Sequence, residues 1–298
     1  MPHSQSTTIQ EFLDYIQHQK RYSQYTVTSY ETDLIAFFDF IQKEYGELEV
    51  ISPSIIRTWL VSLKEQKFES KSINRKISTL KSFFKYQLRA GKIEDSPMTT
   101  IGTLKVSKRL PSYVEEKDTA TLFQHVEFPD TWEGKTEKML LEIFYQTGMR
   151  LSELINLKES DFDKANSQIK VLGKGNKQRI IPATNELLHK IDKYLEEKHS
   201  LTAKTGAAEL LVNKKGDKLN ATLVYKIVKK YLSLVTTNKK KSPHILRHTF
   251  ATHLTNNGAD INSVKELLGH SSLASTQVYT SNTIEKLKDI HKKAHPKA

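Results

Sequence analysis

The chain has no cysteine among its 298 residues. This absence excludes disulfide bonds, zinc sites made of thiolates and a thiol nucleophile. Because a protein without disulfide bonds is compatible with a reducing compartment, the sequence favours a cytoplasmic protein.

Long apolar runs are also missing. Residues 1–10 are polar and lack the apolar centre of a signal peptide, and no stretch approaches the roughly 20 apolar residues that cross a bilayer. The phosphate-binding pattern G-x-x-x-x-G-K-[S/T] does not occur either, and Gly173-x-Gly175 is too short to bind a nucleotide. We therefore expect no secretion, no membrane insertion and no nucleotide cofactor.

Acidic residues are outnumbered by basic ones. The chain contains 46 Lys and Arg against 34 Asp and Glu, which gives a formal net charge of +12 at pH 7. Such an excess favours a polyanionic partner, of which a nucleic acid is the leading example. Charge alone does not decide between this partner and a basic protein that has none.

The first third of the chain predicts four helices joined by short turns. Apolar residues recur at helical spacing at residues 9–16, 30–41, 56–63 and 73–88. Thr8 and Glu11 have the spacing of a capping box, which predicts the start of the first helix. Pro53 predicts the start of the third helix. Gly46 and Gly91 predict the ends of the second and fourth.

These helices make up a predicted N-terminal domain, residues 1–96, and we interpret the basic segment 97–112 as an interdomain linker. The fourth helix carries more Lys and Arg than a solvated face requires, and it could lie along DNA. A basic face kept for solubility is the alternative. The candidate DNA-binding residues of this helix are Lys71, Arg75, Lys76, Lys81 and Lys85.

Residues 113–298 predict a mixed α+β domain, so the whole chain is expected to be mainly α with two domains. A β-hairpin is predicted by residues 168–172 and 178–181, which flank the tip sequence GKGN. Helices are expected near residues 115–123, 137–146, 186–196 and 222–235, with several short ones after residue 246.

Residues 242–248 (SPHILRH) form the densest polar cluster of the chain. His244 and His248 have the spacing of one helical turn and could bind a metal ion from one helix face. The zinc-protease pattern, however, needs Glu where Ile245 stands, and Arg247 would repel a cation. We therefore expect no metal site here.

Four separated motifs resemble the catalytic signature of the tyrosine recombinases, the phage integrase family. They are residues 147–154 (TGMRLSEL), His244-x-x-Arg247-His248, residues 268–270 (LGH) and Tyr279, in that order. Length and layout are similar to those of the bacterial Xer subgroup. The resemblance implies an N-terminal four-helix, SAM-like core-binding domain and a C-terminal catalytic domain, which together form a C-shaped clamp on DNA.

The resemblance also implies the reaction, in which DNA is cut and rejoined through a 3′-phosphotyrosyl bond and a Holliday junction, without ATP, a metal ion or another cofactor. It assigns the nucleophile to Tyr279 and phosphate binding to Arg150, Arg247 and His270. Guanidinium groups suit this role because they stay charged and match the geometry of phosphate oxygens, on which negative charge builds during phosphoryl transfer.

A tyrosine hydroxyl, with an ordinary pKa of about 10, must lose its proton before it attacks. The resemblance assigns the general base to His244. It assigns the acid that protonates the leaving 5′ oxygen to Lys174, with Lys177 as a second candidate.

The remaining site residues have supporting or DNA-binding roles. Glu153 is expected to orient Arg150, and a surface ion pair between the two is the alternative. His248 is expected to support the site or to pack. Beyond the fourth helix, the basic residues expected to bind DNA are Lys177, Arg179, Lys226, Lys239, Lys240 and Lys241.

The C-terminal segment, residues 283–298, has apolar residues at helical spacing and is too short to be a stable helix alone. The resemblance implies that it docks on a neighbouring subunit of a tetramer, made of one protein or of two related ones, on two DNA sites. Docking on its own domain is the alternative. The expected partners are double-stranded DNA with a short near-palindromic site and, as a candidate, a septal DNA translocase.

Three classes of function remain open at this point. A Xer-type recombinase that resolves chromosome dimers at a dif-like site accounts for every motif, and an invertase or mobile-element integrase of the same family is its alternative. A type IB topoisomerase would share the chemistry without a specific site. A DNA-binding regulator without activity would have no need of the catalytic set.

Overall fold

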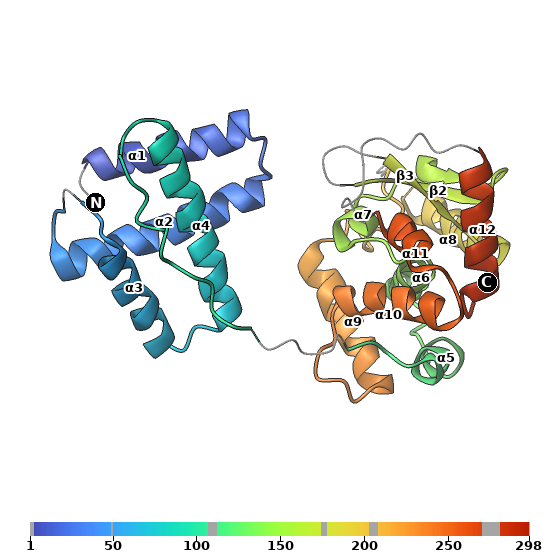
Figure 1. Cartoon of the computed structure of the whole chain (residues 1–298). Coiled ribbons are helices and arrows are strands. Elements are labelled where there is room, and N and C mark those ends of the chain that lie inside the picture. Colours follow the sequence, from blue (N-terminus) through green and yellow to red (C-terminus); the bar gives the residue numbers. More distant parts are fainter. Residues whose placement is uncertain are drawn as a thin grey trace. The chain divides into compact units, whose positions relative to one another are not determined.

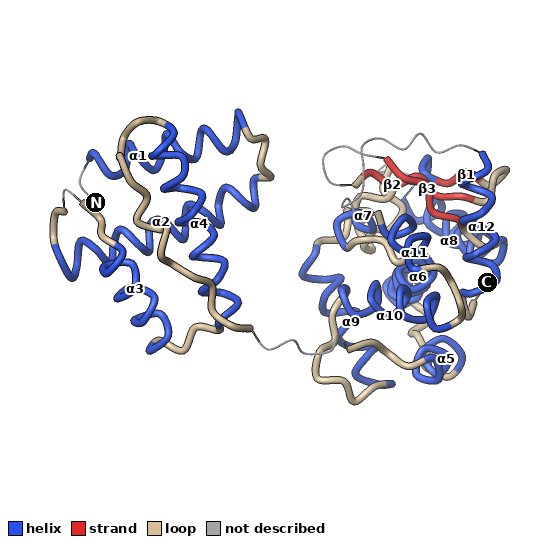
Figure 2. The backbone as a smooth tube through the Cα atoms, viewed as in Figure 1, coloured by secondary structure: helices blue, strands red, loops and turns tan. Residues whose placement is uncertain are grey.

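The computed structural model describes residues 3–48, 50–106, 112–173, 178–202, 208–269 and 281–297. The chain divides into two compact units, Met1–Arg109 and Leu110–Ala298. Helices form the larger part of each unit (Figures 1 and 2). None of the helices in these ranges combines the length and apolar character that a bilayer crossing requires.

The N-terminal unit is built from α1 (His3–Asp14), a short π-helical turn (Tyr15–Gln19), α2 (Gln24–Tyr45), α3 (Pro53–Glu65) and α4 (Ser70–Arg89). The four predicted helices are therefore confirmed. The capping box expected at Thr8 is wrong, because α1 begins at His3 and Thr8 lies inside it. No proline or glycine stands between His3 and Thr8 to stop the helix from starting earlier.

Aromatic side chains form the centre of the N-terminal core. Phe37 packs on Trp59 with ring centroids 4.9 Å apart, and Phe12 meets Phe83 edge-on at 5.4 Å. Each is at most 2% exposed. Burying side chains of this size contributes about 1.5–3 kcal/mol each, so these rings tie all four helices together.

Part of the segment interpreted as a linker belongs to this core. Met98 and Ile101 are buried with the apolar residues of the four helices. Asn74 of α4 holds the backbone of Leu104 from both sides, because its Nδ2 donates to the carbonyl at 2.9 Å and its Oδ1 accepts from the amide at 2.7 Å. The segment is thus fixed to the N-terminal unit at least as far as Leu104.

The C-terminal unit has a larger set of elements. Its helices are α5 (Glu116–Gln124), α6 (Trp132–Thr147), α7 (Leu151–Ile155), a short 3₁₀ turn (Glu159–Asp161), α8 (Asn185–Thr202), α9 (Ala221–Val235), α10 (Pro243–Asn256), α11 (Ile261–Leu268) and α12 (Ser281–Ala294). Its strands are β1 (Phe162–Asp163), β2 (Gln168–Leu172) and β3 (Gln178–Pro182).

The predicted hairpin is present as β2 and β3, which pair antiparallel with Ile169 opposite Ile181. The short strand β1 adds to β2 and completes a sheet of order β1-β2-β3, which the sequence did not predict. Alternate residues of the hairpin, among them Ile169, Val171 and Ile181, are buried against the helices. This alternation is what gives the hairpin one inward face.

Helix α6 runs through the C-terminal unit and contacts α7, α8 and α10 (Figure 1). Residues 139–147 of this helix are all buried, and three of them, Glu142, Gln146 and Thr147, are polar. Since buried polar groups must be paired, these side chains mark the places where α6 is tied to other elements.

The C-terminal segment lies on its own domain in the single chain. Imidazole Nε2 atoms of His291 and His295 donate to the carbonyl oxygens of Gln146 and Tyr145, at 2.8 and 3.2 Å. Docking on its own domain is the alternative that the sequence left open beside the exchange between subunits implied by the resemblance. Exchange between subunits is a property of an assembly and stays a prediction.

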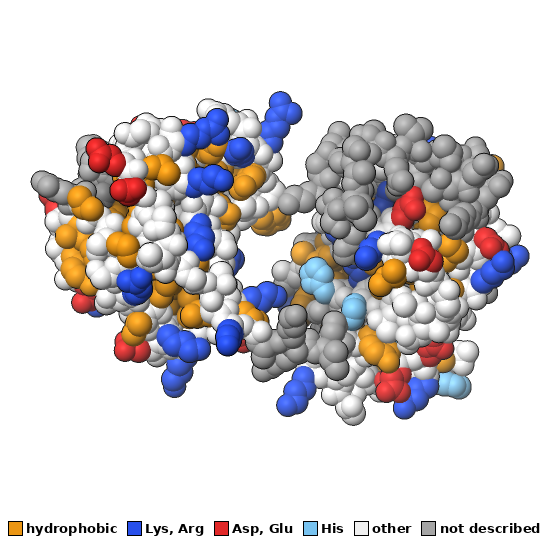
Figure 3. Space-filling view, in the orientation of Figure 1, with side chains coloured by type: hydrophobic (Ala, Val, Ile, Leu, Met, Phe, Trp, Pro, Cys, Tyr) orange, Lys and Arg blue, Asp and Glu red, His pale blue; other side chains and the backbone are white. Residues whose placement is uncertain are grey.

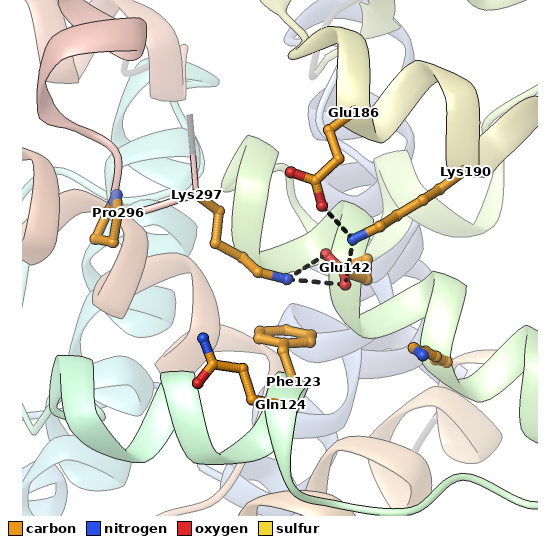
Figure 4. A pocket seen from close by; sticks show the side chains of 8 residues that line it. Phe123, Gln124, Glu142, Glu186, Lys190, Pro296 and Lys297 are labelled. Atoms are coloured by element: carbon orange, nitrogen blue, oxygen red, sulfur yellow. Dashed lines mark hydrogen bonds and ion pairs between the residues drawn. The ribbon is translucent and has the colours of Figure 1, made fainter.

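The last described residue, Lys297, is anchored in a small pocket. Its ammonium group lies 2.8 Å from both carboxylate oxygens of the buried Glu142 and 3.8 Å from the centre of the Phe123 ring. Figure 4 shows Lys190 reaching the same carboxylate from the other side. These paired charges line the pocket and fix Lys297 to α6.

Candidate active site

The first predicted motif forms the turn between α6 and α7. Gly148 ends α6 in the left-handed conformation, with φ +57°, and a Cβ atom there would lie 2.3 Å from the ring of Phe250. Both the backbone angle and the close ring therefore require glycine. The turn places Arg150 as the residue that caps the N-terminus of α7.

Arg150 is held on two sides. Its backbone amide donates to Glu153 Oε2 at 2.6 Å, and its Nη1 donates to Oε1 of the same carboxylate at 2.9 Å. Its Nη2 donates to the carbonyl oxygen of Gly269 at 2.8 Å. The Arg150 side chain is 33% exposed and that of Glu153 only 2%, so the pair is not the surface ion pair considered as an alternative.

Arg179 of β3 is also directed at this carboxylate, which corrects its expected position. Its Nη1 and Nη2 donate to Glu153 Oε1 and Oε2 at 2.6 and 2.8 Å, and its Nε donates to the carbonyl of Leu267 at 3.0 Å. Only 5% of Arg179 is exposed, so it does not offer the surface charge expected of a DNA-binding residue. The signal was available in the sequence, because Arg179 alternates with the apolar Ile181 on the inward face of the strand.

The Glu153 carboxyl is strongly acidic. Burial on its own raises its pKa, but the hydrogen bonds and charge of Arg179, and then the backbone and side chain of Arg150, lower the pKa to about 2. Glu153 is therefore ionised at neutral pH, and it holds two guanidinium groups at once.

Arg247 of α10 is the third guanidinium of the site. Its Nη1 donates to the carbonyl of Gly148 at 2.7 Å, and its Nη2 donates to the carbonyl of Leu268 at 2.6 Å. Burial, followed by the charges of Arg150 and Arg179, lowers the pKa of Arg247 to about 10. Arg247 is still protonated at neutral pH, so positive charge exceeds negative charge here and the site favours an anion.

The two histidines of the second motif lie on α10 on either side of Arg247. His244 is exposed and His248 is partly exposed. Within the described ranges, the structure has no group of three or more His, Asp or Glu side chains placed to hold a metal ion.

Several predicted site residues lie outside the described residues: Tyr279, His270, Lys174 and Lys177. Their roles stay predictions. The described chain reaches Gly173 before Lys174, reaches Gly269 before His270, and resumes at Ser281 after Tyr279.

The cations of α4 divide into an exposed and a buried group. Lys71, Lys81 and Lys85 are exposed, and Figure 3 shows Lys and Arg side chains spread over the N-terminal unit. The prediction that Lys76 binds DNA is corrected. Its side chain is only 7% exposed, and its ammonium group lies 2.8 Å from the buried carboxylate of Asp33. Its inward position gives the fully buried Asp33 carboxylate a counter-ion that is itself buried.

Arg75 shares Asp33 with Lys76, and its side chain is 46% exposed. In the C-terminal unit, Lys226, Lys239 and Lys240 are exposed and Lys241 is partly exposed. The positions of these residues are compatible with contacts to DNA, and the contacts themselves stay predictions.

Two family models match this chain. The model of the phage integrase family matches residues 112–286, and the model of the N-terminal SAM-like domain of phage integrases matches residues 9–91. The chain belongs to the phage integrase family. The resemblance seen in the sequence motifs is therefore confirmed.

Relatives and solved structures agree with this assignment. A protein of Chlorobaculum parvum named tyrosine recombinase XerC is 36% identical over 317 residues, which cover 97% of this chain and 94% of that protein. A protein of the same name from Listeria monocytogenes serotype 4a is 38% identical over 292 residues, 97% of each chain.

Two solved complexes share the fold. The XerH site-specific recombinase bound to its difH substrate, in a pre-cleavage complex, has a TM-score of 0.68 at 23% identity, and the match covers 87% of this chain and 77% of that one. The Tn1549 transposon integrase in complex with transposon right end DNA has a TM-score of 0.71 at 20% identity, over 95% of this chain and 98% of that one.

Proposed function

We propose that this chain, a site-specific tyrosine recombinase of the Xer type, resolves chromosome dimers in the cytoplasm by cutting and rejoining DNA at a short, near-palindromic, dif-like site. One observation carries the proposal. Arg150 and Arg247, which come from motifs far apart in the sequence, donate to the carbonyls of two consecutive residues, Gly269 and Leu268. Both guanidinium groups are thereby fixed beside the residue that precedes His270.

This arrangement suits attack on a phosphodiester. Negative charge builds on the nonbridging oxygens in the transition state, and charged donors that are already in place stabilise it without reorganising. Tyr279 would attack the phosphorus, His244 would take the phenolic proton, and Lys174 would protonate the 5′ oxygen that leaves. The phosphotyrosyl bond retains the energy of the broken phosphodiester, so that rejoining needs no ATP.

The proposed assembly is a tetramer on two DNA sites, with the two units of each chain clamped around a duplex. A lambda integrase tetramer bound to a Holliday junction and a XerH complex with a palindromic difH substrate share the fold of this chain. A second recombinase chain in the tetramer, and a septal DNA translocase that activates it, belong to the same proposal.

Covalent capture tests this function. The protein is incubated with nicked fragments of its source genome, and the DNA that remains bound in SDS is sequenced. We expect enrichment of one near-palindromic chromosomal site. Arg150→Ala and Tyr279→Phe should bind DNA with nearly unchanged affinity and form no covalent adduct, since the first lacks a charge that acts in the transition state and the second lacks the nucleophile.

The other outcomes identify the alternatives. Enrichment of mobile-element ends would indicate an integrase, and capture without sequence preference would indicate a type IB topoisomerase. An adduct formed by Tyr279→Phe would show that the nucleophile is another residue. DNA binding without any adduct, also in the presence of a second recombinase from the same source, would contradict the enzymatic proposal.

A further inference from the structure

We infer that Arg179 is a positioning residue of the cleavage reaction, which acts through Glu153 on Arg150 and through the carbonyl of Leu267 on the end of α11. The inference rests on the proposed function, in which Arg179 was given no role. Arg179 would never contact DNA.

The contacts of Arg179 all point inward. Its three side-chain nitrogens bind Glu153 Oε1 at 2.6 Å, Glu153 Oε2 at 2.8 Å and Leu267 O at 3.0 Å. Each carboxylate oxygen of Glu153 also accepts one hydrogen bond from Arg150. Because the bidentate pair fixes the plane of the carboxylate, it also fixes the direction in which Arg150 points.

The second group of contacts lies at the C-terminal end of α11. A helix leaves its last carbonyl groups without partners in the helix, and these groups carry partial negative charge. Here three successive carbonyls accept from three arginines: Leu267 from Arg179, Leu268 from Arg247 and Gly269 from Arg150. Arg179 thus holds the same helix end that holds the two proposed phosphate ligands.

Gly269 brings the backbone close to Arg179. It has φ +65°, and a Cβ atom there would lie 2.9 Å from Arg179 Cδ. The absence of a side chain therefore lets the α11 end and the Arg179 side chain meet. A residue with a Cβ atom would be strained in this conformation and would displace the arginine.

Burial separates Arg179 from a phosphate ligand. Arg150, which the reaction needs at the surface, is 33% exposed, whereas the side chain of Arg179 is 5% exposed. To reach a phosphate, Arg179 would have to leave Glu153 buried without this partner, which is strongly unfavourable.

The experiment compares two variants that each remove one positive charge from the same hairpin. Arg179→Met removes the buried arginine, and Lys170→Met removes an exposed lysine from β2. The rate of adduct formation is measured at saturating DNA on a nicked substrate, alongside the dissociation constant over a range of salt concentrations. We expect Arg179→Met to slow the cleavage step about 100-fold, as displacement of a reacting group does, with unchanged affinity and salt slope. Lys170→Met should cleave at the wild-type rate.

The pH profile distinguishes positioning from a loss of folded protein. In the wild type, the Glu153 pKa of about 2 keeps the carboxylate ionised throughout the accessible pH range. Without Arg179 the burial remains and its main counter-charge is gone, so this pKa rises. We expect cleavage by Arg179→Met to begin to fall at a higher pH than cleavage by the wild type as the solution is acidified. Arg179→Lys, which keeps the charge, should restore part of the rate and move this pH back toward the wild-type value.

Each result has a distinct meaning. If the wild type forms no adduct, the proposed function fails. If the wild type reacts and both Arg179 variants react at the same rate, the positioning role is overturned. A weaker dissociation constant with a salt slope reduced by about 1 would make Arg179 a phosphate contact after all.

A slower rate with lowered thermal stability but an unchanged pH profile would reduce Arg179 to a structural residue. If Arg179→Met does not fold, Gly269→Ala perturbs the same contact from the other side. It should slow cleavage at saturating DNA without weakening binding, and a wild-type rate for Gly269→Ala would contradict the inference.

Discussion

The two units of this chain contain the same arrangement of charges in different settings. In each, a buried carboxylate binds an inner cation that is almost fully buried and an outer guanidinium that reaches the surface. In the N-terminal unit, Asp33 holds Lys76, which is 7% exposed, and Arg75, which is 46% exposed.

In the C-terminal unit, Glu153 holds Arg179, which is 5% exposed, and Arg150, which is 33% exposed. The inner cation is the main difference. Lys76 makes a single contact to one carboxylate oxygen, whereas Arg179 makes two contacts and also binds the end of α11.

This difference fits what each outer guanidinium is proposed to do. A contact between Arg75 and the DNA backbone tolerates some movement, because it only adds affinity. A catalytic Arg150 does not, because a displacement of about 1 Å lowers the rate about 100-fold. The bidentate inner partner is found in the unit where orientation matters.

The largest expected effect separates the two carboxylates. Asp33→Asn and Glu153→Gln each leave a buried cation without its counter-charge, and each should lower the free energy of unfolding by about 3 kcal/mol. Only Glu153→Gln should also slow adduct formation at saturating DNA, about 100-fold. Hydrogen exchange in α2 and α4 for the first variant, and in α7 for the second, measures the local loss of stability.

A slow cleavage step in Asp33→Asn, at saturating DNA and with the protein folded, would contradict this separation of roles. Equal cleavage rates for all three proteins would remove Glu153 from the set of residues that orient Arg150.

The sequence could predict the elements that depend on local patterns but not the contacts between distant residues. The apolar spacing at 73–88 predicts α4, and the alternation at 168–181 predicts the hairpin, because each pattern is local. The partner of Arg179 is not local, since Glu153 lies 26 residues away and the two side chains meet only in the folded unit. The charge of Arg179 therefore suggested a surface contact, although its alternation with Ile181 indicated the inward face of the strand.

The same reason explains the other corrections. Lys76 faces Asp33 across two helices, and Met98 and Ile101 join a core whose other members come from all four helices. Lys76 lies on the apolar side of α4, between Ile73 and Leu80, but its charge favoured a surface position because its partner Asp33 is 43 residues away. The order and identity of the motifs, in contrast, predicted Arg150, Glu153 and Arg247 as one cluster, because a family resemblance carries information about distant contacts.

Acid should weaken the C-terminal unit more than the N-terminal one. His291 of α12 and His295, which follows this helix, stack with ring centroids 5.0 Å apart. Burial lowers the pKa of His291, and burial together with the charge of His291 lowers the pKa of His295 to about 3. Both are neutral when docked, whereas a released segment takes up protons below about pH 6.5. The docked state therefore loses stability as the pH falls below about 6.5.

For each histidine that takes up a proton on release, the free energy of docking falls by up to about 1.4 kcal/mol per pH unit. Hydrogen exchange measured at pH 7.5 and 5.5 should show α12 opening at the lower pH while α2 and α4, which contain no histidine, stay protected. His291→Gln keeps a hydrogen-bond donor without a titrating group and should reduce the response, which His295 then gives alone. Equal acid sensitivity of α12 in this variant would show that other groups control docking.

The smallest expected effect concerns two lysines of the same helix. Lys81→Gln removes an exposed cation from α4 and should reduce the slope of log affinity against log salt by about 0.9, without changing stability. Lys76→Gln removes the inner cation of Asp33 and should destabilise α2 and α4 while the salt slope stays that of the wild type. The reverse result, with Lys76 setting the slope, would mean that this lysine leaves Asp33 when DNA binds, and that the inner cation of the N-terminal unit is mobile in a way that the bidentate Arg179 is not.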